Sequence, residues 1–324
     1  MAIRRSDALA GKPAEVGTDV FGMAYGTNTT AASLLPSFAS TFEVDMRLQK
    51  EYNGNASWYI GTRMRDHRQL HTNTNAAEVT GTYTSFEHSR GEGNNWNSSR
   101  IGYMWKRHAG FDVVSYLGDG SSSRAIPHNL NQIPQMIWIK NTTHSSTVWV
   151  AGHIGLNGGS NPWDYWIRIS GGTEKEASDG GIAWGGKPPT KTHFHVGGWT
   201  EVNQSQTAGG CVAYLFASVD NVSKLGFYDG DDSTDGSKVI PTGFQPRFIM
   251  IKCVTNDGEN WNIVDSLRGL SGVGGGNDKL LKLNSANSQG NADAVDVSAT
   301  GFALRSGSGD WNAINQKYIY YAHA

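Results

Sequence analysis

The chain has 324 residues, a formal net charge of −2 and only 17% charged residues. Nucleic-acid binding is not expected, because neutralising phosphates requires clustered Lys and Arg. Hydrophobic residues make up 38% of the chain, but no unbroken apolar run approaches the ~20 residues of a membrane span, so no membrane insertion is expected. Glycine occurs 41 times, well above its usual share of about 7%. This excess indicates many tight turns.

Residues 1–40 are rich in Ala, Thr, Ser and Gly and show no sustained period. They contain no apolar segment of signal-peptide length, so we expect a protein that is made and used without secretion. Such a segment is typical of an arm that is ordered only where it docks on a partner. Its sparse apolar residues, which we expect to make the docking contacts, are Val20, Phe21, Met23, Leu34 and Leu35. The alternative is that the arm packs across its own chain.

From Phe42 onward the pattern is typical of β-structure. Runs such as 111–116, 136–140 and 248–252 are rich in β-branched and aromatic residues, and clusters of Gly, Asn, Asp, Ser and Pro separate them. No window of about 12 residues has a helical period. The sequence therefore predicts an all-β protein of short antiparallel strands, arranged as sandwich-like units.

Internal repeats divide this β region. Residues 111–140 and 225–252 share an aromatic strand, a Gly-Asp turn, an Ile-Pro and an apolar strand that ends in Ile-Lys. A Trp strand, a Gly-rich loop and a closing aromatic strand follow in both copies. We expect the two closing strands, 210–217 and 317–324, to be equivalent and to lie at central or near-central positions in their sheets, because apolar residues crowd both of their faces.

A third, partial copy precedes these two. It keeps the Trp strand of SWYIGT, a Phe strand and the closing aromatic strand of RIGYMWK. Since repeats of this kind form one supersecondary unit each, we predict four segments. These are an arm (1–40), a partial repeat unit (41–110) and two β-sandwich-like units (111–220 and 221–324).

Six motifs of the repeats are MWKRHAGFDVVSYLGDG, IPHNLNQIPQMIWIK, GLNGGSNPWDYW, YLFASVDNVSKLGFYDGD, TGFQPRFIMIK and the C-terminal KYIYYAHA. Together they resemble a repeat family of structural and tail-fibre-like proteins of marine bacteriophages. The likeness covers about residues 38–324. It implies a virion protein that contacts other virion proteins and has no catalytic residues and no cofactor. Because the chain is little more than the repeats and a short arm, a compact protein is expected rather than a long fibre.

The expected function is that of a non-enzymatic virion surface protein, assembled in the host cytoplasm, in the tail or fibre apparatus and with a role in host attachment. Alternatives are a head decoration protein or head fibre, a carbohydrate-binding module, and a surface-glycan depolymerase. Hydrolytic chemistry is not indicated, since there is no G-x-S-x-G elbow and nothing selects a carboxylate pair. We expect a homo-oligomer, with a trimer favoured, because fibres and spikes usually have closed cyclic symmetry.

Aromatic residues provide the candidate binding surface, for a host surface glycan or a neighbouring protein, since flat aromatic faces stack on sugar rings and anchor interfaces. Alternation along a strand sends Tyr165 and Trp166 to opposite sides, so one is expected in the core and one at the surface. A plain core role is the alternative for the whole set. The set comprises Trp163, Tyr165, Trp166, Trp184 and Trp199.

Carboxylates and thiols give two weaker candidates. Asp229, Asp231 and Asp232 lie within DGDDSTDG, where closely spaced oxygens could bind Ca²⁺. The segment lacks the EF-hand spacing, however, and an exposed hairpin turn is favoured, so no metal is expected. Cys211 and Cys253 lie in apolar runs and are expected to be buried thiols, with a disulfide as the open alternative.

Overall fold

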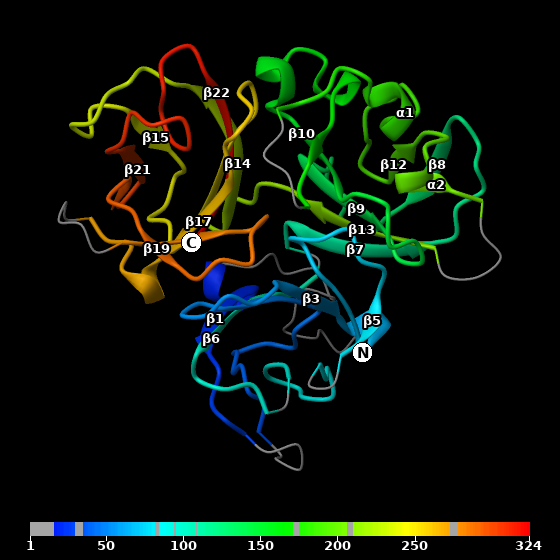
Figure 1. Ribbon diagram of the computed structural model, residues 1–324, viewed down its shortest axis with the longest axis horizontal. Helices are drawn as coiled ribbons and strands as arrows, with labels where there is room; N and C mark the ends of the chain where they lie inside the picture. Colours follow the sequence, from blue (N-terminus) through cyan, green and yellow to red (C-terminus); the bar gives the residue numbers. More distant parts are fainter. Residues whose placement is uncertain are drawn as a thin grey trace, which may run out of the picture.

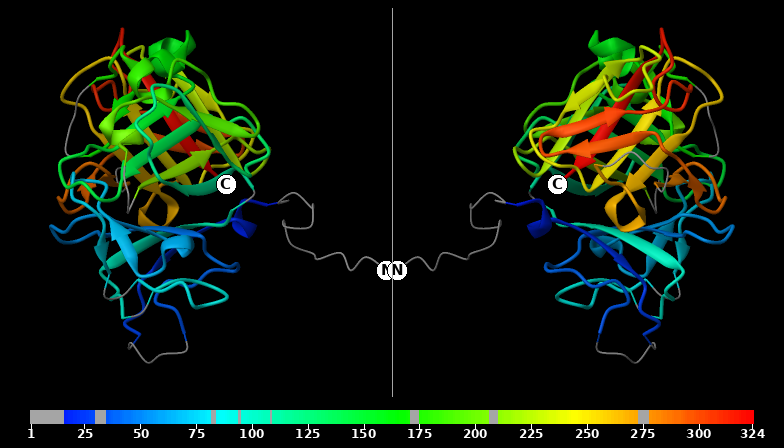
Figure 2. Two further views of the ribbon diagram at one scale, coloured as in Figure 1. Left: turned by 90° about the vertical axis from the view of Figure 1, so that its right-hand side faces the viewer. Right: turned by 90° about the vertical axis from the view of Figure 1, so that its left-hand side faces the viewer.

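The computed structural model describes residues 16–29, 35–81, 84–93, 95–107, 109–170, 175–205, 210–272 and 278–324. These residues form an almost entirely β structure, as predicted, with antiparallel pairing between all named strands. Figure 1 shows three lobes grouped around a common centre, which follow one another along the chain. In the side views of Figure 2 the first lobe, in blue and cyan, lies beneath the other two.

The first lobe is built on one six-stranded sheet in the order β1-β6-β2-β3-β4-β5. Its strands are β1 (Phe21–Tyr25), β2 (Met46–Glu51), β3 (Tyr59–Thr62), β4 (Arg68–Leu70), β5 (Val79–Thr80) and β6 (Arg100–Trp105). Two short 3-10 turns, η2 (Gly17–Asp19) and η3 (Arg63–Arg65), complete its regular structure.

The second lobe pairs a five-stranded sheet, β11-β10-β9-β13-β7, with a two-stranded one, β12-β8. Its strands are β7 (Phe111–Tyr116), β8 (Arg124–Pro127), β9 (Met136–Asn141), β10 (Val150–His153), β11 (Ile167–Arg168), β12 (His193–Val196) and β13 (Cys211–Phe216). Its helical turns are η4 (Leu156–Gly159), η5 (Pro162–Asp164), α1 (Gly180–Trp184) and α2 (Thr200–Asn203).

The third lobe pairs a six-stranded sheet, β14-β22-β16-β17-β18-β19, with a three-stranded one, β15-β21-β20. The strands of the larger sheet are β14 (Ser223–Asp229), β16 (Phe248–Cys253), β17 (Trp261–Asp265), β18 (Lys279–Lys282), β19 (Gly290–Asn291) and β22 (Lys317–His323). The smaller sheet has β15 (Val239–Pro241), β20 (Val295–Ser298) and β21 (Gly301–Leu304), and η6 (Ser266–Arg268) follows β17.

The three large sheets share one strand order. An opening strand, a closing strand and three further strands run as β1-β6-β2-β3-β4, β7-β13-β9-β10-β11 and β14-β22-β16-β17-β18. The closing strands β13 and β22 each lie between two neighbours, as predicted for residues 210–217 and 317–324. The predicted boundaries near residues 110 and 220 fall between β6 and β7 and between β13 and β14.

One core is common to all three lobes. Alternate side chains of the closing strands face it, among them Tyr103 of β6, Tyr214 of β13 and Tyr321 of β22. The opposite faces of these strands pack inside their own lobe, as Tyr320 and Ala322 do in the third. Because both faces are covered, the closing strands have no polar face, which explains the apolar crowding of their sequences.

Three tryptophans connect the lobes in a ring. Trp261 opens β17, whereas Trp58 and Trp149 immediately precede β3 and β10, and all three side chains are fully buried. Each indole N–H donates to a main-chain carbonyl of another lobe. The bonds join Trp58 to Lys282 (2.8 Å), Trp149 to His71 (2.9 Å) and Trp261 to Arg168 (2.9 Å). The first lobe thus bonds to the third, the third to the second and the second to the first, which is a threefold arrangement within one chain.

Buried lysines recur at the matching place in each lobe. Lys50, Lys140 and Lys252 lie near the ends of β2, β9 and β16, and none of them is exposed. Their ammonium groups donate to carbonyl oxygens of the loop that follows, such as Ala56 for Lys50 and Glu259 for Lys252. Burial lowers the pKa of Lys50 and of Lys140 to about 8. These lysines close the loop before each Trp strand by satisfying its carbonyl groups.

The first lobe is covered differently from the other two. Among its described residues no second sheet lies over the large one, and irregular segments provide the covering cluster. That cluster comprises Phe38, Phe42, Val44, Phe86, Trp96 and Met104. Arg47 and Glu92 form an ion pair of 3.1 Å beneath it, with neither side chain exposed. In the other lobes Ile137 and Ile249 occupy the position of Arg47, so the sequence gives no warning of this pair.

Within the predicted docking arm, the described residues 16–29 and 35–40 include a strand of the fold, which agrees with the alternative of an arm packed across its own chain. Phe21 opens β1, which pairs with β6, and its ring lies unexposed in the shared core. Val20 is 2% exposed and Met23 packs partly buried against the same core. For Val20, Phe21 and Met23 the docking prediction is wrong. The partners of Phe21, such as Trp105 and Phe248, lie far away in the sequence, so no local pattern indicates them. Leu35 is exposed, whereas Leu34 lies outside the described residues.

Both cysteines are buried and unbonded, which answers the open question of a disulfide. Cys211 lies in β13 and Cys253 in β16, so they belong to different lobes. Burial raises the pKa of the Cys211 thiol to about 12. Both are therefore inert core residues rather than reactive thiols.

Candidate functional site

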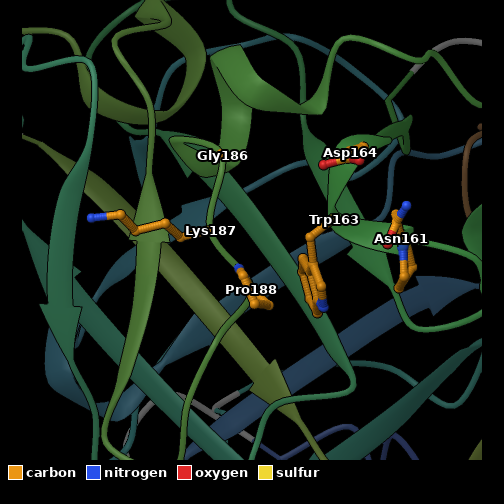
Figure 3. A pocket seen from close by; sticks show the side chains of 7 residues that line it. Asn161, Trp163, Asp164, Gly186, Lys187 and Pro188 are labelled. Carbon is orange, nitrogen blue, oxygen red and sulfur yellow. The ribbon is translucent and has the colours of Figure 1, made fainter.

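A small cavity opens at the surface of the second lobe. It has a volume of about 210 Å³ and lies between η5 and the chain that follows α1. Figure 3 shows the indole of Trp163 at its centre, with Pro188 next to it. Its lining residues are Asn161, Pro162, Trp163, Asp164, Gly186, Lys187 and Pro188.

A glycine in the strand below makes room for this cavity wall. Gly152 lies in β10, and a Cβ placed on it would come within 2.5 Å of the Trp163 ring and 2.7 Å of the Trp184 ring. The two indoles cross edge to face with centroids 5.3 Å apart. Trp184 is itself held by a 2.8 Å hydrogen bond from its indole N–H to the Tyr165 carbonyl. The Trp163 ring is therefore held rigidly, with 8% of its surface exposed.

The five predicted binding aromatics separate into three places. Trp163 and Trp184 form the cavity wall and its support, and both are buried. Trp166 and Trp199 form a half-buried surface pair with ring centroids 4.7 Å apart, and the Trp166 indole donates to Asp179. Tyr165 packs against the core shared by the lobes.

Alternation sends Tyr165 and Trp166 to opposite sides, as expected, but neither residue is fully buried or fully exposed. Both side chains are half-buried, because Tyr165 reaches the shared core while Trp166 packs against the core of the second lobe alone. Because this segment lies between two cores, each of its faces is partly covered. Of the five, Trp163 is the one that lines the cavity described above.

The acidic turn of the third lobe is internally bonded. The Asp231 carboxylate accepts from the Ser233 hydroxyl at 2.7 Å and from the Asn312 amide at 2.8 Å. These bonds, with the Ser233 hydroxyl as the main cause, lower the pKa of Asp231 to about 2. Asp229 pairs with Lys317 at 2.7 Å, while Asp232 accepts from the Ile314 main-chain N–H.

The three acids of this turn therefore point to separate partners rather than to one point. No group of three His, Cys, Asp or Glu side chains suited to a metal ion is found in the part of the chain that the structure describes. The favoured interpretation as a hairpin turn agrees with these bonds. The weak calcium interpretation has no convergent ligand set to support it.

The second lobe repeats this turn in detail. Asp119 accepts from the Ser121 hydroxyl at 2.6 Å and from the Asn203 amide at 3.0 Å, and its pKa is lowered to about 2. Sequence reasoning identified the Gly-Asp turn but missed the two asparagines. Asn203 and Asn312 are fully buried, and each precedes the closing strand of its lobe. Their matching position before the closing strand is the sequence feature that could have identified them.

Comparison with known proteins supplies a family and nothing more. A family model described as a domain of unknown function, DUF7483, matches residues 23–324. No curated protein and no solved structure matches the chain significantly. None of the helices in the described ranges is both long enough and apolar enough to span a bilayer.

Proposed function

We propose that this chain, which belongs to the DUF7483 family, is a non-enzymatic structural protein on the surface of a bacteriophage particle. Its place is the tail or fibre apparatus, where it takes part in host attachment after assembly in the host cytoplasm. The observation that carries the proposal is the closed ring of three sheets around one core, joined by Trp58, Trp149 and Trp261. The order of motifs shared with virion repeat proteins supports it.

A closed ring of this kind suits a load-bearing part. Each lobe buries its Trp strand against a neighbour, so no lobe can leave without exposing a fully buried indole and an unpaired carbonyl. The polar residues of the repeated turns support the same role, since Asp119 and Asp231 are fully engaged with Asn203 and Asn312. We interpret the recurrence of these side chains in two lobes as a requirement of folding rather than of catalysis.

A homotrimer and contacts with other virion proteins are further parts of the proposal. The aromatic side chains of the closing strands face the shared core, so any contact between copies would use the outer surfaces. Exposed apolar side chains on those surfaces include Leu117, Ile133 and Ile314. Light scattering at assembly concentrations tests this part, and a purely monomeric protein would contradict it.

A second candidate function is that of a carbohydrate-binding module. The cavity beside Trp163 favours it, because an indole bordered by polar side chains is suited to a sugar ring. A head decoration protein and a glycan depolymerase are the remaining alternatives, and each predicts a different experimental result.

The test is to purify the particles that contain this protein and to measure its copy number by quantitative mass spectrometry. Antibody labelling in electron micrographs then gives its position. We expect a fixed stoichiometry and labelling at the tail. Labelling over the head would establish the decoration alternative, and absence from particles would refute a virion role. Shortening of host polysaccharide by the isolated protein would identify a depolymerase.

A further inference from the structure

We propose that the cavity beside Trp163 binds one pyranose unit of a neutral glycan. This inference rests on the proposed role in host attachment and names the ligand class for it. The cavity of about 210 Å³ is smaller than the ~300–1,000 Å³ of sites for drug-sized ligands. A single sugar ring, with the rest of the glycan in solvent, matches that size.

The apolar part of the cavity comes from three ring side chains. Pro162 and Pro188 line it together with Trp163, and Figure 3 shows the indole and the Pro188 ring next to each other. The C–H face of a pyranose packs on such an aromatic plane, while its hydroxyl groups point outward from the rim. The apolar surface therefore binds the ring and leaves its hydroxyls for polar partners.

The polar part of the cavity is unpaired. The side chains of Asn161 and Asp164 form no hydrogen bond or ion pair with any residue that the structure describes, although both border the cavity. Asp119 and Asp231, in equally exposed turns, are bonded to serine and asparagine. The two polar groups beside Trp163 are thus left available to the hydroxyl groups of a ligand.

The loops around the cavity are held in unusual backbone conformations. Asn157 and Asn161 have φ values of 50° and 46°, and Gly185 and Gly186 have 61° and 68°. Left-handed geometry is costly for residues other than glycine and clusters at functional sites. Together with the edge-to-face support from Trp184, it presents a preorganised surface, which lowers the entropic cost of binding.

The charge of the cavity selects a neutral ligand. The carboxylate of Asp164 lies on the Gly186 side of the cavity in Figure 3, whereas the ammonium group of Lys187 points away from the indole. An acidic sugar would bring its carboxylate towards Asp164, and Lys187, the cation that lines the cavity, holds its ammonium group away from the indole. Neutral hexosides are therefore expected to bind more tightly than uronic or sialic acids.

The experiment uses the full chain and saturation-transfer NMR. The probes are methyl glucopyranoside, methyl galactopyranoside, methyl mannopyranoside and, as an acidic comparison, methyl glucuronide. We expect saturable binding of at least one neutral probe and weaker binding of the glucuronide. Asp164→Ala should weaken binding about tenfold, the effect of one hydrogen bond to a charged group. Lys187→Ala, the matched control, should leave it within about twofold.

Trp163 is tested by two variants. Trp163→Ala should abolish binding, and Trp163→Phe, which keeps an aromatic face and much of the packing, should weaken it while the melting temperature stays close to that of the parent. Trp199→Phe, outside the cavity, should change nothing. The inference is overturned if no neutral probe binds, if the glucuronide binds best, if a proline-rich peptide binds instead, or if Asp164→Ala has no effect.

Failure of this inference is distinguishable from failure of the proposed function. Asp164→Ala should enter particles with the parent stoichiometry, since its side chain forms no hydrogen bond or ion pair with any residue that the structure describes. If the parent protein enters particles normally but binds no sugar, the structural role is supported and the sugar-binding inference is refuted. If it binds sugar but is absent from particles, the sugar-binding inference is supported and the virion role is refuted.

Discussion

The second and third lobes differ at one position that lies beneath the wall of the cavity. Gly152 of β10 and Val264 of β17 occupy the same place, opposite Ile137 and Ile249. In the third lobe Val264 fills the space with its own side chain and belongs to the core of that lobe. In the second lobe the missing side chain admits two indoles, Trp163 and Trp184.

This comparison separates two kinds of residue. Positions that the lobes share, such as Trp149 and Trp261 or Asn203 and Asn312, hold the sheets and turns together. Positions at which they differ, such as Gly152, give one lobe a feature of its own. A repeat protein can thus acquire a cavity in one lobe without altering the ring of three sheets, because single positions and loops can vary while the contacts between lobes stay the same.

The largest expected effect comes from breaking the ring itself. Trp149→Ala should cost about 3–5 kcal/mol of the free energy of unfolding, since it removes a buried indole and leaves the His71 carbonyl unpaired. Trp261→Ala should cost a similar amount if the lobes are mechanically equivalent. Denaturant unfolding followed by circular dichroism measures both, and a loss under 1 kcal/mol in either would show that this lobe is not bound into the ring.

Giving the second lobe the residue of the third should close its cavity. Gly152→Val introduces a Cβ that meets two buried indoles, so we expect a loss of about 3 kcal/mol, at the upper end for overpacked cores. Tryptophan fluorescence should change as Trp163 moves. The control is Val264→Ala in the third lobe, which should lower stability without altering the emission of Trp163. Unchanged stability in Gly152→Val would contradict the contact.

The closing strands also differ at one matched position, where the first two lobes have Trp105 and Phe216 and the third lobe has His323. Burial lowers the pKa of His323 from 6.5 to about 3. Between these values the unfolded chain binds more protons, so stability is present above pH 6.5 and is lost as the pH falls towards 3. Relative to His323→Phe, the parent should lose about 2 kcal/mol at pH 5.

Unfolding curves of the parent and His323→Phe between pH 7 and 5 measure that difference. Using the variant as reference is necessary because Glu92, whose pKa is raised to about 7 by burial, changes stability in the opposite direction. Parallel pH profiles for the two proteins would show that His323 does not titrate as its burial predicts.

The smallest effect concerns the asparagine turns. Asn203→Ala and Asn312→Ala each remove a buried amide that bonds an aspartate, and each should cost about 1–2 kcal/mol. The pKa of Asp119 or Asp231 should rise towards its ordinary value in the matching variant, measured by NMR titration. Equal losses would show that both turns act alike, whereas a neutral substitution in one lobe would show that its turn is dispensable.

Sequence reasoning predicted what local patterns encode. The strands over 111–116, 136–140 and 248–252, the Gly-Asp turns and the central closing strands were all predicted. Trp163 was identified among candidate binding residues and borders the cavity. Phe21 was misplaced because its partners, Phe248 and His323, lie more than 200 positions away in sequence.

The sequence by itself determined the β-character of this chain, since side-chain period, β-branched runs and turn residues act over a few neighbours. Only the tertiary structure decided how the lobes close. The bond from Trp58 to Lys282 spans 224 positions, and no local pattern specifies which carbonyl an indole will meet. The same holds for the cavity, because the missing side chain of Gly152 matters only when the indoles of Trp163 in η5 and Trp184 in α1 pack against it.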